Sequence, residues 1–161
     1  MEYQIRALRP EERPLLEEFL YLAIFVPEGE EPPPRSVLKT PELRVYLSGF
    51  GTEESDFALA AEAEGRVAGL VWTRIMEDYG HIDNDTPSFA VSLYPEYRGA
   101  GMGTAMMREM LALLKRAGYR RASLAVQKAN RAAGLYRRLG FRIFAETETE
   151  YIMVRPLSEN L

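Results

Sequence analysis

The ligand-binding chemistry of this sequence is concentrated in a glycine-rich segment that precedes a long helical pattern. The segment consists of Arg98, Gly99, Ala100, Gly101, Met102, Gly103 and Thr104. Glycine tolerates positive φ angles and lets the backbone approach a ligand closely, with its N–H groups pointing inward. The helix expected to begin at Thr104 adds unpaired N–H groups and the positive end of its dipole. The segment therefore predicts a binding site for a phosphate or pyrophosphate.

Two better-known glycine motifs do not fit this segment. The dinucleotide fingerprint G-x-G-x-x-G requires a third glycine at position 104 or 106, where the chain has Thr104 and Met106. It also requires an acidic residue roughly 20 positions later, and no acid lies between Arg120 and Arg131. A nucleotide P-loop requires lysine before its Ser or Thr, and Gly103 occupies that position. Neither spacing therefore matches.

The charges are divided unevenly along the sequence. Between Arg98 and Arg142 there are eleven basic residues and a single acid, Glu109, whereas the rest of the chain has nine basic and 23 acidic residues. This division suggests one polyanionic and one cationic ligand. Solvated helix faces are the alternative explanation for most of the individual residues. The acidic net charge of −4 and the lack of interleaved aromatic residues argue against a nucleic-acid partner.

Length and composition limit the class of protein. A chain of 161 residues is expected to form one domain, 1–161, with a substantial core. No apolar run approaches the ~18 residues of a membrane span, and Met1–Gln4 carries no basic region followed by an apolar one. We therefore expect a cytoplasmic protein without membrane contact. The sequence has no cysteine, which excludes disulfides, thiolate metal sites and a cysteine nucleophile, and no metal is expected.

Hydrophobic periodicity and turn signals predict strands and helices in a mixed order. Strands are expected at 3–8, 56–63, 66–76, 88–94, 121–127, 141–146 and 149–154. Helices are expected from residue 15 for about four turns, from Thr40 to Gly49, over 104–117, and from 130 or 131 to 139. The strand-helix-strand unit 88–127 requires a parallel strand pair with a right-handed crossover. The fold class is therefore α+β in three layers: a mixed, mostly antiparallel sheet with a central parallel pair, flanked by about four helices.

Two motifs carry a resemblance to a known family. Residues 93–103 read Leu-Tyr-Pro-Glu-Tyr-Arg-Gly-Ala-Gly-Met-Gly and match the loop (Arg/Gln)-x-x-Gly-x-(Gly/Ala). Residues 130–141 read Asn-Arg-Ala-Ala-Gly-Leu-Tyr-Arg-Arg-Leu-Gly-Phe and look like Asn-x-Ala-x-x-Leu-Tyr-x-x-Leu-Gly-Phe. With these motifs and this order of elements, the whole chain resembles the GNAT superfamily of N-acetyltransferases.

The resemblance implies how a cofactor is bound. In this family the pyrophosphate of coenzyme A lies on the amides of the loop and helix start, which are Arg98 to Thr104 here. The pantetheine arm lies between two parallel strands that splay apart, and it bonds to main-chain groups near Leu93. Asn130 is expected to contact the cofactor, with a role as helix N-cap alone as the equal alternative. Acetyl-CoA is therefore the expected co-substrate.

The resemblance also implies a mechanism in which a neutral amine attacks the thioester. A free primary amine has a pKa near ~10, so a base must remove a proton, often through water. The backbone of strand 88–94 can donate an N–H to the tetrahedral oxyanion. Tyr136 matches the family's general acid, and a half-buried structural tyrosine is the alternative. Because no cysteine is available, direct transfer in a ternary complex is expected.

The general base is not identified by the motifs. Some family members place glutamate at the position of Ala125, and alanine cannot serve. The other candidates for the base or for substrate binding lie in the linker before the cofactor strand: Glu77, Asp78, His81, Asp83 and Asp85. Further acids lie in the first long loop: Glu28, Glu30 and Glu31. A solvated surface position is the alternative for each of these acids.

The expected acceptor is a cationic amine, either a small molecule or a protein N-terminus, attracted by these acids. A non-catalytic acyl-CoA-binding sensor or scaffold is the alternative function, because Ala125 leaves the base unassigned. Homodimers are common in the family, so a second copy of the chain is a further expected partner.

Overall fold

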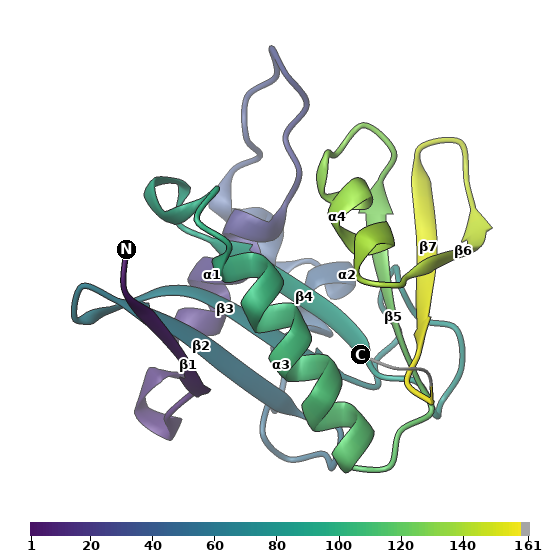
Figure 1. Ribbon diagram of the computed structural model, residues 1–161. Helices are drawn as coiled ribbons and strands as arrows, with labels where there is room; N and C mark the ends of the chain where they lie inside the picture. The colour runs from purple at the N-terminus through teal and green to yellow at the C-terminus, as the bar shows by residue number, and fades with distance from the viewer. Residues whose placement is uncertain (159–161) are drawn as a thin grey trace.

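A seven-stranded sheet forms the centre of the molecule, as seen in the computed structural model, which describes residues 1–158 (Figure 1). The strands are β1 (Tyr3–Ala7), β2 (Phe57–Ala63), β3 (Arg66–Arg74), β4 (Ser88–Leu93), β5 (Arg121–Gln127), β6 (Arg142–Glu146) and β7 (Glu150–Pro156). Their order in the sheet is β1-β2-β3-β4-β5-β7-β6. Within this sheet β4 and β5 are parallel and the other neighbours are antiparallel. This arrangement confirms the predicted mixed sheet with a central parallel pair.

Helices cover both faces of the sheet. The α-helices are α1 (Leu15–Ala23), α2 (Pro41–Arg44), α3 (Met102–Arg116) and α4 (Ala132–Arg138), and the 3-10 helices are η1 (Pro10–Glu12), η2 (Arg35–Lys39) and η3 (Pro95–Tyr97). Figure 1 shows α3 and α4 in front of the sheet and α1 and α2 behind it. Among residues 1–158, no helix is both long and apolar enough to cross a membrane.

Each face of the sheet has its own core. On the α3 side, Phe89 of β4 and Leu124 of β5 pack against the methionines and leucines of α3. On the α1 side, Ala90 of β4 packs with Phe19 and Leu20 of α1 and with Trp72 of β3. Because side chains alternate along a strand, the even-numbered residues of β4 face α1. The Ser92 hydroxyl confirms this, since it donates a hydrogen bond of 2.6 Å to the Phe19 carbonyl.

Two helices are shorter than the sequence pattern indicates. The first spans nine residues instead of four turns, because the backbone becomes extended at Ile24. The second is helical only over Pro41–Arg44, although Thr40 and Pro41 begin it as predicted. Turns follow it as far as Gly51, whose φ of 99° is incompatible with a continuing helix.

A buried ion pair fixes the segment that connects α2 to β2. The Arg74 guanidinium and the Asp56 carboxylate are 3.0 Å apart, with 7% and 0% of their side chains exposed. Arg74 also donates to the carbonyls of Val45 and Ser48. Asp56 also accepts the N–H groups of Gly51 and Glu53. This network ties the segment over residues 45–56 to the end of β3.

Candidate active site

The central feature of the site is an opening between β4 and β5. The two strands share a single bridge, between Ser88 and Ser123, and the Ser123 N–H donates 2.9 Å to the Pro87 carbonyl. At the other end of β4, the Tyr94 N–H donates 3.0 Å to the Ala68 carbonyl of β3. Since successive backbone groups alternate in direction, the Val91 and Leu93 N–H groups point toward β5. Neither is paired with that strand within the described chain.

The glycine segment lies at the open end of this gap. Gly101 is in the left-handed conformation, with φ of 87°, and is the N-cap of α3. The helix therefore begins at Met102, two residues before the predicted start, and its first internal bond joins the Ala105 N–H to the Gly101 carbonyl. The N–H groups of the preceding residues, through Thr104, have no intrahelical partner. A helix N-terminus of this kind is suited to an anion, and it lies beside the last residue of β4, since a Cβ on Gly103 would be 3.7 Å from Leu93 Cδ1.

Gly69 allows β3 to approach the end of β4. A Cβ atom there would lie 2.4 Å from Leu93 Cδ2 and 2.8 Å from the Ser92 carbonyl oxygen. A β-bulge lies next to Gly69, because Ala68 is skipped where β3 pairs with β2. The position of Leu93 therefore depends on this glycine.

We expect Gly69→Ala to weaken acetyl-CoA binding about ten-fold. The added methyl group would displace the end of β4, and the loss of one hydrogen bond to the cofactor there corresponds to a change of this size. Overpacking should also lower the free energy of unfolding by roughly 1–3 kcal/mol. Isothermal titration and denaturant unfolding measure the two effects separately. An unchanged dissociation constant in the folded variant would show that the end of β4 does not contact the cofactor.

Tyr136 lies on α4, on the α3 side of the sheet. Its ring contacts Phe141 at a centroid distance of 6.0 Å, and Phe141 contacts Phe89 of β4 at 6.0 Å. The phenol therefore belongs to the cluster that lines β4. Burial raises the pKa of Tyr136 to about 12. Its hydroxyl makes no hydrogen bond to residues 1–158, so its proton remains available for a ligand.

Asn130 lies just before α4 and has a local structural role. Its side-chain oxygen accepts the Ala132 N–H at 2.9 Å, which satisfies one of the unpaired donors at the helix start. The N-cap of α4 is Arg131, so Asn130 supports the helix start from one position earlier than the N-cap role considered from the sequence. A cofactor contact by Asn130 is still a prediction.

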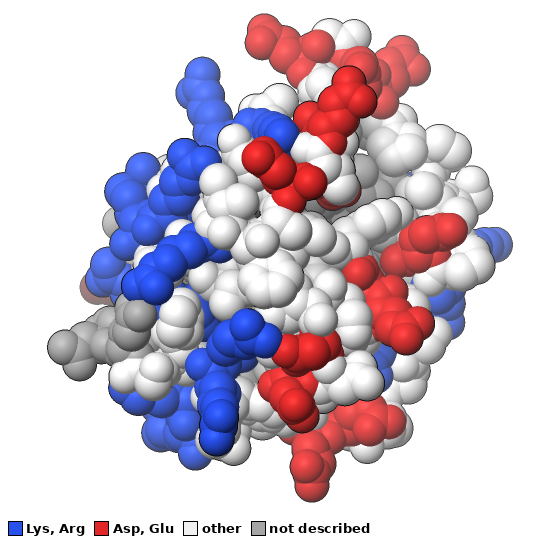
Figure 2. All heavy atoms as spheres, turned by 90° about the vertical axis from the view of Figure 1, so that its right-hand side faces the viewer, with Lys and Arg blue, Asp and Glu red and all other residues white. Residues whose placement is uncertain are grey.

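Opposite charges gather on different sides of the molecule. In Figure 2 most of the Lys and Arg side chains lie on the left, which is the side of α3 and α4 at the front of Figure 1. The Asp and Glu side chains lie mainly at the top and on the right. Arg98 in the glycine segment is exposed and makes no ion pair within residues 1–158. Arg98 thus gives the glycine segment an exposed positive charge that favours a polyanion.

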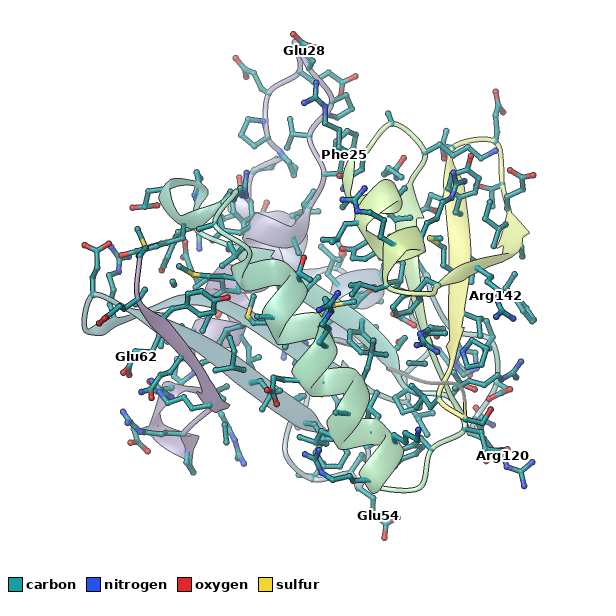
Figure 3. All side chains as sticks on the ribbon, in the orientation of Figure 1. Phe25, Glu28, Glu54, Glu62, Arg120 and Arg142 are labelled. Carbon is teal, nitrogen blue, oxygen red and sulfur yellow. The ribbon has the colours of Figure 1, made fainter. Side chains whose placement is uncertain are left out.

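Most of the acidic candidates are separated from the opening or already paired. Asp83 forms an ion pair with Arg121, and hydrogen bonds from Thr86 and the Asp85 N–H lower the pKa of the Asp83 carboxyl. The side chains of Glu77 and Asp85 are exposed. Figure 3 shows Glu28 at the tip of its loop, away from the sheet. A carboxylate held in the ionised form, as Asp83 is, makes a weak base.

His81 and Asp78 are the two candidates in the linker that turn toward the protein. The ring Nδ1 of His81 lies 2.8 Å from the Met76 carbonyl, to which its N–H donates. Asp78 lies beside the bridge of the opening, because its Oδ2 accepts the Ser88 hydroxyl at 2.9 Å. Burial raises the pKa of Asp78 above the ordinary aspartate value of 3.8. Asp78 is thus the acid that the structure brings to the opening.

Sequence reasoning missed two groups near Asp78. The Tyr46 hydroxyl interacts with the Asp78 carboxylate. Burial is the largest cause of the raised pKa of Tyr46, and the negative charge of Asp78 is the second. Glu150, at the start of β7, contributes to the same rise. Neither residue belongs to a motif, and the chain positions 46, 78 and 150 are far apart. Hydrophobic spacing carries no signal that would bring them together.

Comparison with known proteins identifies the family of this chain. Residues 19–141 match the model of the Acetyltransferase (GNAT) family, which is more than half of the chain. The chain belongs to the GNAT acetyltransferase family. Among the residues described, no group of three or more His, Cys, Asp or Glu side chains is arranged to hold a metal ion.

The relatives within the GNAT family differ in length and in name. A mycothiol acetyltransferase from Saccharomonospora viridis is 29% identical over 156 residues, covering 86% of this chain and 51% of the relative. The corresponding protein of Pseudarthrobacter chlorophenolicus is 29% identical over 126 residues, covering 78% of this chain and 39% of its own length. The chain therefore spans about half or less of the curated relatives that it matches here.

Solved GNAT structures share the fold over nearly the whole chain. The ribosomal-protein-S18-alanine N-acetyltransferase of Escherichia coli superposes with a TM-score of 0.66 at 18% identity, covering 99% of this chain and 96% of its own. The PaiA N-acetyltransferase of Thermoplasma acidophilum, in complex with coenzyme A, superposes with a TM-score of 0.70 at 18% identity, covering 97% and 99%. At these identities the likeness concerns the fold.

Proposed function

We propose that this chain transfers an acetyl group from acetyl-CoA to a primary amine, directly and within a ternary complex. The opening between β4 and β5 carries the proposal, because its unpaired N–H groups end at the N-terminus of α3. A ligand with an extended amide-containing arm and a pyrophosphate complements both features. Coenzyme A has this composition, and one structural neighbour is in complex with it.

In the proposed complex, the pyrophosphate lies on the amides of residues 99–104, with Arg98 as a charged contact. The pantetheine arm extends along β4 and bonds to the groups that β5 leaves unpaired. An N–H of β4, from Val91 or Leu93, then lies within reach of the acetyl carbonyl. Such a donor stabilises the oxyanion that forms when nitrogen attacks the carbonyl carbon.

Tyr136 is proposed as the acid that protonates the departing thiolate. It lies on the α3 side and packs through Phe141 against β4. A phenol with a pKa of about 12 stays protonated throughout the physiological range, so the proton is present when the carbon–sulfur bond breaks. Direct transfer is proposed because the sequence has no cysteine to form an acyl-enzyme.

The acceptor is proposed to be a cationic amine. The names of two relatives refer to mycothiol and to alanine of a ribosomal protein, so a small molecule and a protein N-terminus are both to be tested. The acidic surface outside the α3 side complements the positive charge of either acceptor.

The decisive experiment measures release of the coenzyme A thiol from acetyl-CoA in the presence of an amine panel. The panel contains amino sugars, polyamines, amino acids and short peptides with a free N-terminal alanine. Isothermal titration of acetyl-CoA without acceptor provides the parallel binding measurement. We expect binding together with turnover on one class of amine.

The alternative, a non-catalytic acyl-CoA-binding module, makes a different prediction in the same experiment. Binding of acetyl-CoA without turnover on any amine would favour it. No binding of acetyl-CoA at all would overturn both functions.

A further inference from the structure

One side-chain oxygen of the described chain is buried without a partner. Across residues 1–158, Asp78 Oδ1 is the sole buried side-chain nitrogen or oxygen that lacks a hydrogen bond. Its companion Oδ2 accepts the Ser88 hydroxyl at 2.9 Å. Buried acceptors are almost always satisfied, so an unpaired one calls for a donor from outside the chain, such as a bound water or ligand.

The Asp78 carboxylate is held rigidly at the closed end of the opening. Ser88 is the β4 residue of the one bridge to β5, and its bridge partner Ser123 donates its hydroxyl to the Gly80 carbonyl at 2.8 Å. Gly80 lies so close to β5 that a Cβ there would be 2.9 Å from the Leu124 carbonyl carbon. The turn carrying Asp78 is thus anchored to both strands that form the gap.

The carboxylate lies on the α1 side of the sheet, opposite to Tyr136. Ser88 shares a face of β4 with Ala90 and Ser92, which contact the α1 core. Tyr136 packs in the core of the α3 side. A group inserted between β4 and β5 is therefore flanked by the phenol on one face and by the carboxylate on the other.

The groups around Asp78 do not neutralise it. Tyr46 from the segment after α2 interacts with it directly, and Tyr79 and Glu150 of β7 act on Tyr46 in turn. His81 of the same turn is bound to the Met76 carbonyl. Asp78 has no ion pair with any Lys or Arg among residues 1–158. A cationic group that arrives on this face would be its first positive partner.

We propose that Asp78 is the general base for the acceptor amine, acting through one water bound at Oδ1. The assignment rests on the acetyl transfer proposed above and names the residue that the motifs leave open. Ser88 positions the carboxylate through Oδ2, which leaves Oδ1 to accept the proton. Burial raises the pKa of Asp78, which moves it toward the operating range of a base.

The carboxylate of Asp78 and the phenol of Tyr136 each handle one proton of the reaction, from opposite faces of the sheet. The ammonium group loses one proton through the water to Asp78, which later releases it to solvent. The free nitrogen then bonds to the acetyl carbon, the carbon–sulfur bond breaks, and its electron pair leaves on sulfur. Tyr136 gives its proton to that sulfur, and the nitrogen's second proton restores the phenol. The products are the acetamide, the free thiol and one proton.

The test is Asp78→Asn in the full chain, assayed with the best amine of the panel. The amide keeps the shape and still accepts the Ser88 hydroxyl. We expect kcat/KM at pH 7 to fall by about 10²-fold or more, with acetyl-CoA affinity unchanged. The residual activity should rise about ten-fold per pH unit as free amine accumulates. Glu109→Gln, which removes an exposed carboxylate from α3, is the control and should match the wild type.

Thermal unfolding separates the catalytic role from a structural one. Because the pKa of Asp78 is raised by folding, the folded state binds more protons than the unfolded state between pH 3.8 and the folded pKa. Wild-type stability therefore falls as pH rises through the folded pKa. Asn cannot ionise, so the Tm of the variant should match or exceed that of the wild type at pH 7. The difference in Tm between the two proteins should grow as pH rises through the folded pKa of Asp78. A lower Tm accompanied by weaker acetyl-CoA binding would indicate a structural role and overturn the proposal.

Activity measurements on the variants and on the wild type distinguish the base assignment from the proposed function. Activity within three-fold of wild type in Asp78→Asn would overturn the assignment while leaving the acetyl transfer intact. A larger loss in Asp83→Asn or Asp85→Asn would move the base to that residue. Ser88→Ala removes the hydroxyl that Asp78 Oδ2 accepts. This variant should reduce kcat/KM less than Asp78→Asn does, and it should shift the acidic limb of the pH profile of kcat/KM. A wild type that turns over no amine would refute the proposed function itself.

Discussion

Replacing Tyr136 by phenylalanine is expected to lower kcat by about 10²–10³-fold at neutral pH, the usual contribution of a positioned acid. The hydroxyl has no hydrogen-bond partner among residues 1–158, so its removal leaves no buried group unsatisfied. The ring contact with Phe141 is retained. We therefore expect unchanged thermal stability and an acetyl-CoA dissociation constant within about two-fold of wild type. Thiol-release kinetics and titration calorimetry measure the two parameters independently.

Tyr119→Phe is the matched control for this prediction. Tyr119 is another half-buried tyrosine whose pKa is raised by burial, and it follows the C-terminal end of α3, away from the glycine segment. Its loss should leave kcat unchanged. Equal effects of the two substitutions, or an active Tyr136→Phe enzyme, would return Tyr136 to the structural role considered from the sequence.

Removing the carboxylate of Asp56 is expected to destabilise the chain more than any surface substitution. Asp56→Ala leaves the Arg74 guanidinium buried without its counter-charge, and truncating one partner of a buried pair costs about 3–5 kcal/mol. It also orphans the N–H groups of Gly51 and Glu53. For a chain of this size the loss corresponds to a fall in Tm of roughly 10 °C. Urea unfolding followed by circular dichroism measures it.

Two further variants define the origin of that loss. Glu18→Ala removes one partner of the exposed ion pair with Arg35 and should change Tm little. Asp56→Ala combined with Arg74→Met should recover part of the lost stability, because the uncompensated charge is gone. If the double variant is no more stable than Asp56→Ala, the loss arises from the broken loop contacts instead.

The order of strands and helices could be predicted because it depends on local patterns. The helix at 102–116 shows apolar residues at helical spacing and ends within one residue of the predicted end at 117, followed by Gly118 with φ of 95°. Its start was misplaced by two residues because the cap is Gly101, whose left-handed conformation is not visible in a pattern of side chains. The first two helices were overestimated for a related reason, since apolar spacing continues through turns that are not helical.

The two halves of the site differed in how far they could be predicted. The glycine segment is contiguous, so its seven residues could be identified and placed at a helix start. Asp78 was one of several linker acids of equal standing in the sequence. What distinguishes it is contact with Ser88 and Tyr46, which come from a strand and from a distant segment. Burial of a loop carboxylate is a tertiary property that periodicity does not report.

The single bridge between β4 and β5 has a consequence for folding itself. The Val91 and Leu93 N–H groups are not paired with β5 among residues 1–158, so that strand does not protect them from exchange with solvent deuterium. If acetyl-CoA completes them, its occupancy adds to the free energy of unfolding, by about 2.7 kcal/mol at a hundred times its dissociation constant. The sheet would then be held together at its centre by its own substrate, and the melting temperature of the chain would report how much donor is present.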